Sequence, residues 1–230
     1  MSDVLLYAIL SVLPLIIGAV AGSRINLSRH TLAILFAFGA GSFISALSYD
    51  LFVVSFEAGG AGSAGGGLLA GVVVYILLSQ LVLKRVRRSE AGGIAPMIGD
   101  FIDGVPESLV LGSALATIGG SPALLAAVMV SNFPESFASA GRLRSAGKPA
   151  WFSLTAWSLI AATLAGFVLL GAALGEVPAR ILAPVQSFAA GAVIGMVVNT
   201  LLPMAYKEGG PWVAFATATG FLFAFLLEKV

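Results

Sequence analysis

Apolar runs of about 20 residues recur along the whole chain, separated by short charged or glycine- and proline-rich joints. A bilayer core about 30 Å thick needs about 20 apolar residues per crossing helix, so each run is long enough to span a membrane. The chain is 59% hydrophobic and only 10% charged, which a soluble domain of this length would not tolerate. We therefore expect an all-α integral membrane protein whose residues 1–230 form a single transmembrane domain.

Cutting the chain at its joints predicts eight spans, and the basic residues test this count. The predicted spans cover residues 4–22, 31–56, 66–86, 94–117, 121–142, 151–174, 179–205 and 211–229. Of the 12 Lys and Arg residues, all but Arg180 and Lys229 then fall in the joints on one side. Because basic joints stay in the cytoplasm, we expect a multi-pass protein of the cytoplasmic membrane with both termini extracytoplasmic. Its partners would include the lipid bilayer and no nucleic acid.

The second and seventh predicted spans resemble each other at an offset of 150 residues. The segment "AFGAGSFISALSYDL" (Ala37–Leu51) aligns with "SFAAGAVIGMVVNTL" (Ser187–Leu201), and a glycine pair follows each. An offset of five spans inverts one copy in the membrane, as in many secondary transporters. This predicts a 3+2+3 arrangement, with helices 1–3 and 6–8 as inverted repeats around a central helix 4/5 pair. The glycine-rich segment Glu57–Gly67 is expected to be a flexible extracytoplasmic loop.

Oxygen-bearing side chains within the spans are the functional candidates. Ionisable residues at membrane depth are costly and mark ion or substrate pathways by default. Spacings of three and four place the acids of the fourth span on one helix face, and helix 5 presents a similar stripe. The candidate residues are Asp50, Asp100, Asp103, Glu107, Ser131, Asn132 and Glu135.

A proline directly precedes two of these acids, in "DGVPES" (Asp103–Ser108) and "SNFPES" (Ser131–Ser136). Proline frees the carbonyl four residues back and bends the helix, which a membrane protein tolerates where the backbone lines a cavity. No basic residue is expected deep in these spans, so the acids must be protonated, solvated or paired with a bound cation. We expect a cation site; the alternative is that protonated carboxyl groups hydrogen-bond between helices and hold the bundle together.

These two motifs resemble the doubled H-N-x-P-E-G signature of helices 4 and 5 in the ZIP family of divalent metal transporters. The segment "GRLRSAGK" after the fifth span resembles the basic turn of that family. By position, Glu107 and Glu135 match its metal-binding glutamates, Asp103 and Ser131 stand where it has histidines, and Asn132 stands where it has an asparagine. The resemblance implies transport of a divalent cation such as zinc, manganese or iron into the cytoplasm, without a cofactor. It is also compatible with a homodimer.

The chain departs from the ZIP family pattern at positions that would determine which metal binds. Its only histidine is His30, in the first cytoplasmic joint, and "NTLLP" (Asn199–Pro203) replaces the acidic pair that the family often has in helix 7. We therefore expect one primary site rather than a binuclear one. An all-oxygen site suits Mn²⁺, Mg²⁺ or Ca²⁺ better than a site with histidine does. Asp50 and Asp100 would form approaches to it.

Two other functions stay open from the sequence. The missing histidines and helix 7 acids fit a ZIP-like protein that no longer transports and acts as a membrane sensor or scaffold. Buried acids also serve proton and sodium carriers. An enzyme is not expected, because the chain has no H-E-x-x-H motif and no convincing Ser/Lys or Ser/His pair.

Overall fold

The computed structural model describes residues 2–88, 94–174 and 177–229, and helices account for nearly all of them. This confirms the expected all-helical class. In chain order the elements are α1 (Ser2–Gly22), α2 (Arg29–Ala46), π-helical η1 (Leu47–Val53), α3 (Val54–Arg88), α4 (Ile94–Ile118), α5 (Pro122–Ser145), α6 (Ala150–Ala173), α7 (Ala179–Met196), π-helical η3 (Val197–Leu201), α8 (Leu202–Gly209), 3₁₀-helical η4 (Gly210–Trp212) and α9 (Val213–Lys229).

Local sequence signals explain several helix starts. Ser28 caps α2 by accepting a hydrogen bond from the backbone N–H of Thr31 at 2.9 Å. Ser121 caps α5 in the same way from Leu124 at 2.8 Å, and Pro122 follows at the first helical position. Serine at the cap and proline just inside are favoured because both accommodate the N–H groups that the first turn leaves without intrahelical partners.

The predicted loop at Glu57–Gly67 is wrong, because this segment is helical. The α3 range consists of two helices joined at a kink, and the kink is at Gly60, with φ 73° and ψ 172°. At the end of this segment and just after it, glycine permits close packing: a Cβ at Gly67 or Gly71 would collide with the backbone carbonyl of Pro184 or Phe188 on α7, whereas Gly62, Gly65 and Gly66 have open space around them. Small residues that allow such close approach are typical of membrane helix pairs.

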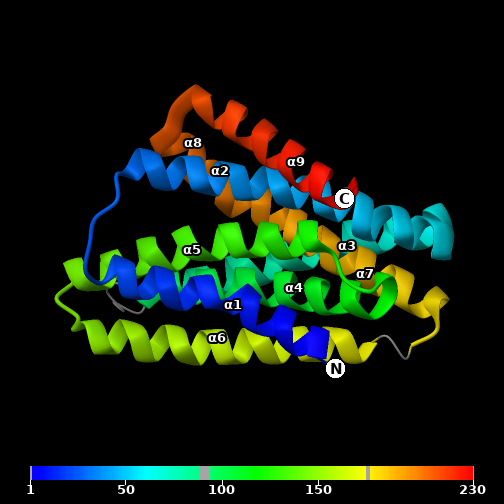
Figure 1. Ribbon diagram of the computed structural model, residues 1–230, viewed down its shortest axis with the longest axis horizontal. Helices are drawn as coiled ribbons and strands as arrows, with labels where there is room; N and C mark the ends of the chain where they lie inside the picture. Colours follow the sequence, from blue (N-terminus) through cyan, green and yellow to red (C-terminus); the bar gives the residue numbers. More distant parts are fainter. Residues whose placement is uncertain (1, 89–93, 175–176, 230) are drawn as a thin grey trace.

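The helices form two groups that lie against each other (Figure 1). In the first group, α1, α4, α5 and α6 enclose a core of their own that includes Leu15, Trp157 and Leu164. In the second group, α2 packs along α9 and α3 packs along α7, with α8 beside α2. The groups meet where α2 contacts α5 and where α4 contacts α7, so α4 and α5 lie in the middle of the protein.

The segments that match in sequence also match in structure. Helices α2 and α7 are both 18 residues long, start 150 residues apart, and both continue into a π-helical segment. A Cβ at Gly41 of α2 would collide with the carbonyl of Thr217 on α9, and one at Gly191 of α7 with that of Leu68 on α3. The second group therefore contains two helix pairs, α2/α9 and α7/α3, with the same kind of close contact.

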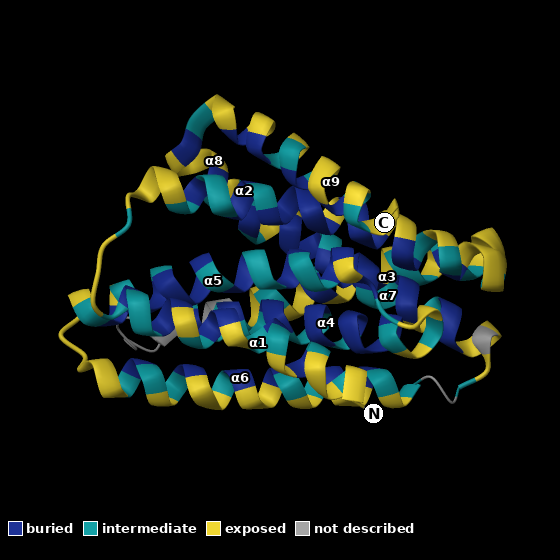
Figure 2. Cartoon of the chain, in the orientation of Figure 1, coloured by how far each residue is buried: buried dark blue, intermediate teal, exposed yellow. Residues whose placement is uncertain are grey.

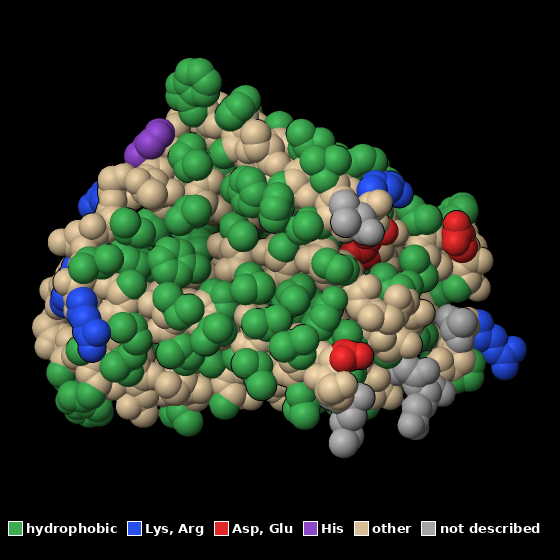
Figure 3. Space-filling view, viewed as in Figure 1, with side chains coloured by type: hydrophobic (Ala, Val, Ile, Leu, Met, Phe, Trp, Pro, Cys, Tyr) green, Lys and Arg blue, Asp and Glu red, His purple; other side chains and the backbone are tan. Residues whose placement is uncertain are grey.

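The outer surface is apolar over the length of the helices. Large hydrophobic side chains on α1, α3, α6 and α9 are exposed, and Figure 2 shows that burial is concentrated on α4, α5 and the inward faces of their neighbours. Figure 3 shows hydrophobic side chains across the middle of one face and charged ones toward its two ends. A continuous apolar surface of this kind needs lipid around it. The protein is therefore membrane-embedded.

Helix lengths do not divide the described chain into eight separate spans. Five helical runs in that part are long and apolar enough to cross a membrane: residues 2–22, 29–82, 96–118, 150–173 and 180–229. Helix α5 is not among them, since several serines, Asn132 and Glu135 lower its hydropathy. It is instead enclosed by other helices, with its polar stripe buried.

Candidate cation site

Four buried carboxylates lie in the middle of the protein. Asp100, Asp103 and Glu107 are on α4, and Glu135 is on α5; Glu107 is 1% exposed and Glu135 is 3% exposed. Both helices continue through the proline that precedes the glutamate. The four carboxylates are close enough for their charges to interact: Glu135 with each of the three acids of α4, and Asp103 with both Asp100 and Glu107. The structure thus brings together the acids that the sequence placed on two consecutive helices.

Asp103 is held by a side chain from the other helix group. The hydroxyl of Tyr75 on α3 donates a hydrogen bond to Asp103 Oδ1 at 2.6 Å. Thr200 Oγ1, in η3, lies 3.1 Å from the same hydroxyl. Because the single phenolic proton goes to the carboxylate, Thr200 is the donor in that second bond. These contacts join α3, η3 and α4 at one point of the interface between the two groups.

Glu107 and Glu135 have oxygens that no protein donor satisfies. Neither carboxylate oxygen of Glu107 accepts a hydrogen bond from any residue that the structure describes, and the same holds for Glu135 Oε1 and Asp100 Oδ2. A buried polar atom without a partner costs free energy, and a buried carboxylate without one costs more. If these acids only joined helices to one another, each would have a donor. They can instead receive a proton or a cation.

The four acids are spread along the helices rather than gathered in a compact cluster, and we call this arrangement the carboxylate file. From Asp100 to Glu107 the helix rises about 10 Å, at about 1.5 Å per residue. Among residues 2–88, 94–174 and 177–229, no three His, Cys, Asp or Glu side chains converge where they could hold a metal ion. A cation in this arrangement would be bound by one or two carboxylates at a time, together with neutral oxygens such as those of Tyr75 and Thr200.

Ser131 and Asn132 are buried on α5 but are turned mainly toward other helices. Ser131 donates to the carbonyl of Val128 in its own helix at 3.1 Å and packs against Gly39 of α2. The amide nitrogen of Asn132 donates to the carbonyl of Ser11 on α1 at 2.7 Å, while its Oδ1 has no partner within the described chain. Asn132 therefore ties α5 to α1 and keeps one oxygen available, whereas the described hydrogen bond of Ser131 stays within α5.

Asp50 lies apart from the four central acids. It is 1% exposed within η1 and accepts a hydrogen bond from Ser121, the residue that caps α5. Its charge interacts with those of Glu228 and Lys229 near the end of α9. The surrounding Leu47, Leu51 and Leu124 are also fully buried, so this end of the α4/α5 pair is tightly packed.

Two adjoining cavities lie toward the other end of the protein, and the inner one is lined by two of the acids. The wide cavity has a volume of about 800 Å³, and its lining includes Asn26, Arg29, Phe36, Arg142 and Lys207. The inner pocket has a volume of about 250 Å³, and its lining includes Tyr75, Asp100, Asp103, Arg142 and Thr200. Both cavities share Pro96, Arg142 and Met204. Asp100 and Asp103 can therefore be reached from the basic end, and Glu107 and Glu135 lie deeper.

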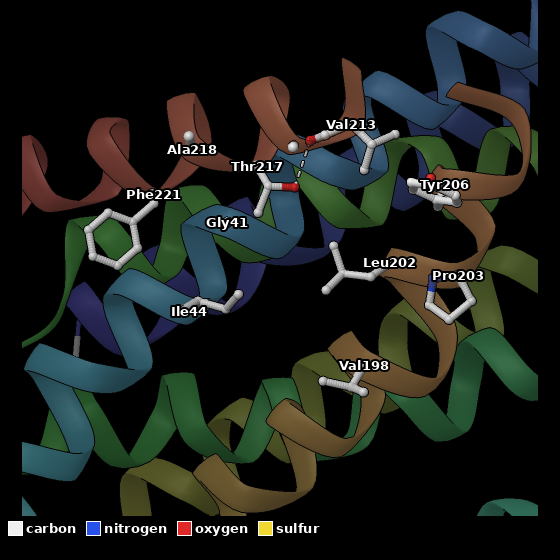
Figure 4. Close-up of a pocket in the computed structure, with 11 residues that line it drawn as sticks. Gly41, Ile44, Val198, Leu202, Pro203, Tyr206, Val213, Thr217, Ala218 and Phe221 are labelled. Atoms are coloured by element: carbon white, nitrogen blue, oxygen red, sulfur yellow. Dashed lines mark hydrogen bonds between the residues drawn. The ribbon is translucent and has the colours of Figure 1, made fainter. Parts of the chain in front are cut away.

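The other large pocket lacks the chemistry for a cation. It lies between α2, η3, α8 and α9, with a volume of about 780 Å³ and a lining that is almost wholly apolar (Figure 4). The hydroxyl of Thr217 donates to the carbonyl of Val213 within α9. Ile44, Val198 and Phe221 supply hydrophobic surface. This pocket suits lipid chains rather than ions.

Sequence reasoning missed three residues of the site: Tyr75, Thr200 and Arg142. A signal existed for the first two. Tyr75 is a single phenol in the apolar run "VVVYILL", and Thr200 stands 150 residues after Asp50, at the equivalent position of the repeat. Arg142 was assigned to a cytoplasmic joint, and it lies on the last turn of α5, exposed, where its charge acts on Asp100 without forming an ion pair.

Comparison with known protein families finds no match to this chain, and no curated protein is significantly similar to it.

Proposed function

We propose that this protein is a carrier in the cytoplasmic membrane that moves a divalent metal cation into the cytoplasm, as its resemblance to the ZIP family implies. One observation carries the proposal. Glu107 and Glu135, on consecutive helices, are buried in the middle of the protein and have oxygens without donors among the described residues. Carboxylates in that situation bind a cation or a proton.

The course of the chain supports this proposal. The helical runs of residues 29–82 and 180–229 have 54 and 50 residues, more than twice the length that one crossing needs. Each is interrupted by a glycine with positive φ, Gly60 at 73° and Gly210 at 62°. If each run crosses twice, then with α1, α4, α5 and α6 the chain makes eight crossings. The matched pairs α2/α9 and α7/α3 fit the inverted 3+2+3 arrangement, which is common in transporters.

The cavities indicate the direction of release. The wide cavity opens among the basic residues Arg29, Arg142 and Lys207, at the end that the positive-inside rule assigns to the cytoplasm. The opposite end, around Asp50 and Ser121, is packed. With the proposed orientation, the cavity faces the cytoplasm, and the packed end faces the outside.

Ligand chemistry favours hard divalent ions. The donors near the path are mainly carboxylate, phenol, hydroxyl and amide oxygens, with the thioether of Met204 the one sulfur in the described lining of the inner pocket. Oxygen donors suit Mn²⁺, Mg²⁺ and Ca²⁺, although Zn²⁺ and Fe²⁺ also bind them. The metal is the transported substrate and no cofactor is required.

The test is uptake into proteoliposomes, with Mn²⁺, Zn²⁺, Fe²⁺, Cd²⁺ and Mg²⁺ offered separately. Glu107→Gln and Glu135→Gln keep the side-chain shape and remove the charge; Glu57→Gln, at an exposed position, is the matched control. We expect saturable uptake by the parent and by the control, and its loss in both central variants. Absence of both uptake and metal binding in folded protein would favour a sensor or scaffold.

A proton or sodium carrier is the second candidate, and one observation favours it. No three acids converge in the described part of the chain, and monovalent cations need fewer charged ligands. An imposed proton or sodium gradient separates the two functions. Dissipation of that gradient through the parent protein without any divalent uptake would replace the metal proposal with this one.

A further inference from the structure

Arg142 lies at the boundary between the two cavities. It is on the last turn of α5, and its side chain lines both the wide cavity and the inner pocket that holds Asp100 and Asp103. A cation that moves from the inner pocket to the wide cavity passes the residues that the two share, and Arg142 is the charged one among them. Because Arg142 carries a permanent positive charge, it opposes any cation that rests beside it.

The other charges around the wide cavity are arranged differently. Arg29 lies 3.8 Å from Glu208 in an ion pair, and both residues belong to the second helix group. Lys207 also lines the wide cavity but does not line the inner pocket. Of the basic residues that the structure describes, Arg142 alone lines the inner pocket.

Arg142 acts on Asp100 without being locked to it. Its charge attracts the Asp100 carboxylate, but the two side chains are not within ion-pair distance in the described structure. Its neighbour Arg144 differs: it donates a hydrogen bond to Asn26 at the surface and lines neither cavity. Two arginines on one helix turn therefore have different surroundings, and only one of them faces the acids.

We propose that Arg142 is the release residue of the carrier: its guanidinium competes with the transported cation for Asp100 and Asp103 and so displaces the ion into the wide cavity. This rests on the proposed function. Buried carboxylates without protein donors attract a divalent ion strongly even one or two at a time, and strong attraction slows its departure. A positive charge held at the cytoplasmic side of the carboxylate file weakens metal binding there. Once the metal has left, the same charge can pair with the acids.

The expected effect is large enough to measure. At a separation of several ångströms and an effective dielectric constant of about 20, removing a unit charge beside a divalent ion changes affinity by about tenfold or more. The neutral variant Arg142→Gln should bind Mn²⁺ about tenfold more tightly and transport it with a lower maximal rate. Arg142→Lys, which keeps the charge, should stay close to the parent.

The experiment measures Mn²⁺ binding to purified protein in detergent at fixed ionic strength, and initial uptake rates in proteoliposomes. Arg144→Gln is the charge-matched control and should leave both quantities unchanged. Arg142→Met is a second neutral variant that keeps an apolar stem, in case the glutamine variant does not fold. Thermal unfolding establishes which variants are folded.

Each outcome is decisive. Unchanged or weaker Mn²⁺ binding in a folded neutral variant overturns the release role, even where uptake falls. An equal gain of affinity in Arg144→Gln also overturns it, because the effect would then be general surface charge. If the parent transports metal, such a result leaves the proposed function standing. If the parent binds and transports none of the five metals, both proposals fall together.

Discussion

Tyr75 and Asp103 are joined by a hydrogen bond of 2.6 Å that connects the two helix groups at the candidate site. Tyr75 belongs to α3 in the second group, and Asp103 belongs to α4 in the first. Thr200, also of the second group, completes the contact through the tyrosine hydroxyl. The position of Asp103 therefore depends on how the two groups are placed, which couples the geometry of the acid to the conformation of the protein.

Tyr75→Phe should weaken both stability and metal uptake. The change removes the donor to a buried carboxylate, which costs about 1–3 kcal/mol when the acceptor stays buried. The freed Asp103 would no longer be held in one orientation, so KM for the metal should rise severalfold. Thermal unfolding in detergent and uptake kinetics measure the two effects.

Tyr49→Phe is the control for this prediction. Tyr49 is partly exposed and packs its ring against Phe225 of α9. Loss of its hydroxyl should leave unfolding and KM unchanged. Equal behaviour of the two tyrosine variants would show that the Tyr75–Asp103 bond does not matter for the site.

Gly171→Ala should destabilise the first helix group. A Cβ at Gly171 of α6 would collide with the carbonyl of Leu109 on α4, so the two helices would have to move apart. Overpacking of this kind costs about 1–3 kcal/mol. Gly166→Ala on the same helix meets nothing within 4 Å and should be neutral or stabilising by up to about 1 kcal/mol. Measured in one detergent, the unfolding midpoint should fall for Gly171→Ala and should stay unchanged or rise for Gly166→Ala.

Asn132→Ala should lower stability through the contact between α1 and α5. The variant loses the 2.7 Å bond to the carbonyl of Ser11. Leaving a buried acceptor without its donor costs about 1–3 kcal/mol of stability. Asn199→Ala removes a similar bond, 2.8 Å to Gly195 within one helix, from an exposed side chain. The second variant should unfold close to the parent. A parent-like Asn132→Ala would instead indicate that the amide serves only as a potential ligand.

Most of the sequence-based prediction came from the length of the apolar runs and from the spacing of the acids along the chain. Membrane helices can be predicted from sequence because each span needs about 20 mostly apolar residues. Residues three or four apart lie on the same face of any helix. The burial of Asp100, Asp103, Glu107 and Glu135 follows from those two facts. The offset of 150 residues also proved informative, since α2 and α7 have the same length and the same π-helical continuation.

Contacts between distant segments could not be predicted in this way. Tyr75 is 28 residues from Asp103 and 125 from Thr200, and no local pattern records which helices become neighbours. For the same reason, the sequence did not predict which residues would surround Arg142. The segment Glu57–Gly67 misled because its glycines indicate a flexible chain in water, whereas the backbone of a membrane helix keeps its internal hydrogen bonds and uses glycine to approach a neighbour.

Ser121→Ala should destabilise the protein more than loss of an ordinary helix cap. Ser121 caps α5 at 2.8 Å from the N–H of Leu124 and also donates to the buried Asp50. Cap removal costs about 0.5–2 kcal/mol, and leaving the Asp50 carboxylate without its donor adds about 1–3 kcal/mol.

Ser28→Ala separates the two contributions, because Ser28 caps α2 at an exposed position and bonds to no buried acid. Its effect on thermal unfolding should be smaller than that of Ser121→Ala. In the background Asp50→Ala, the Ser121→Ala change should then cost only as much as a cap, because the acid that needed the donor is gone. Equal costs of Ser121→Ala in both backgrounds would mean that the Ser121–Asp50 bond contributes nothing to the packed end of the protein.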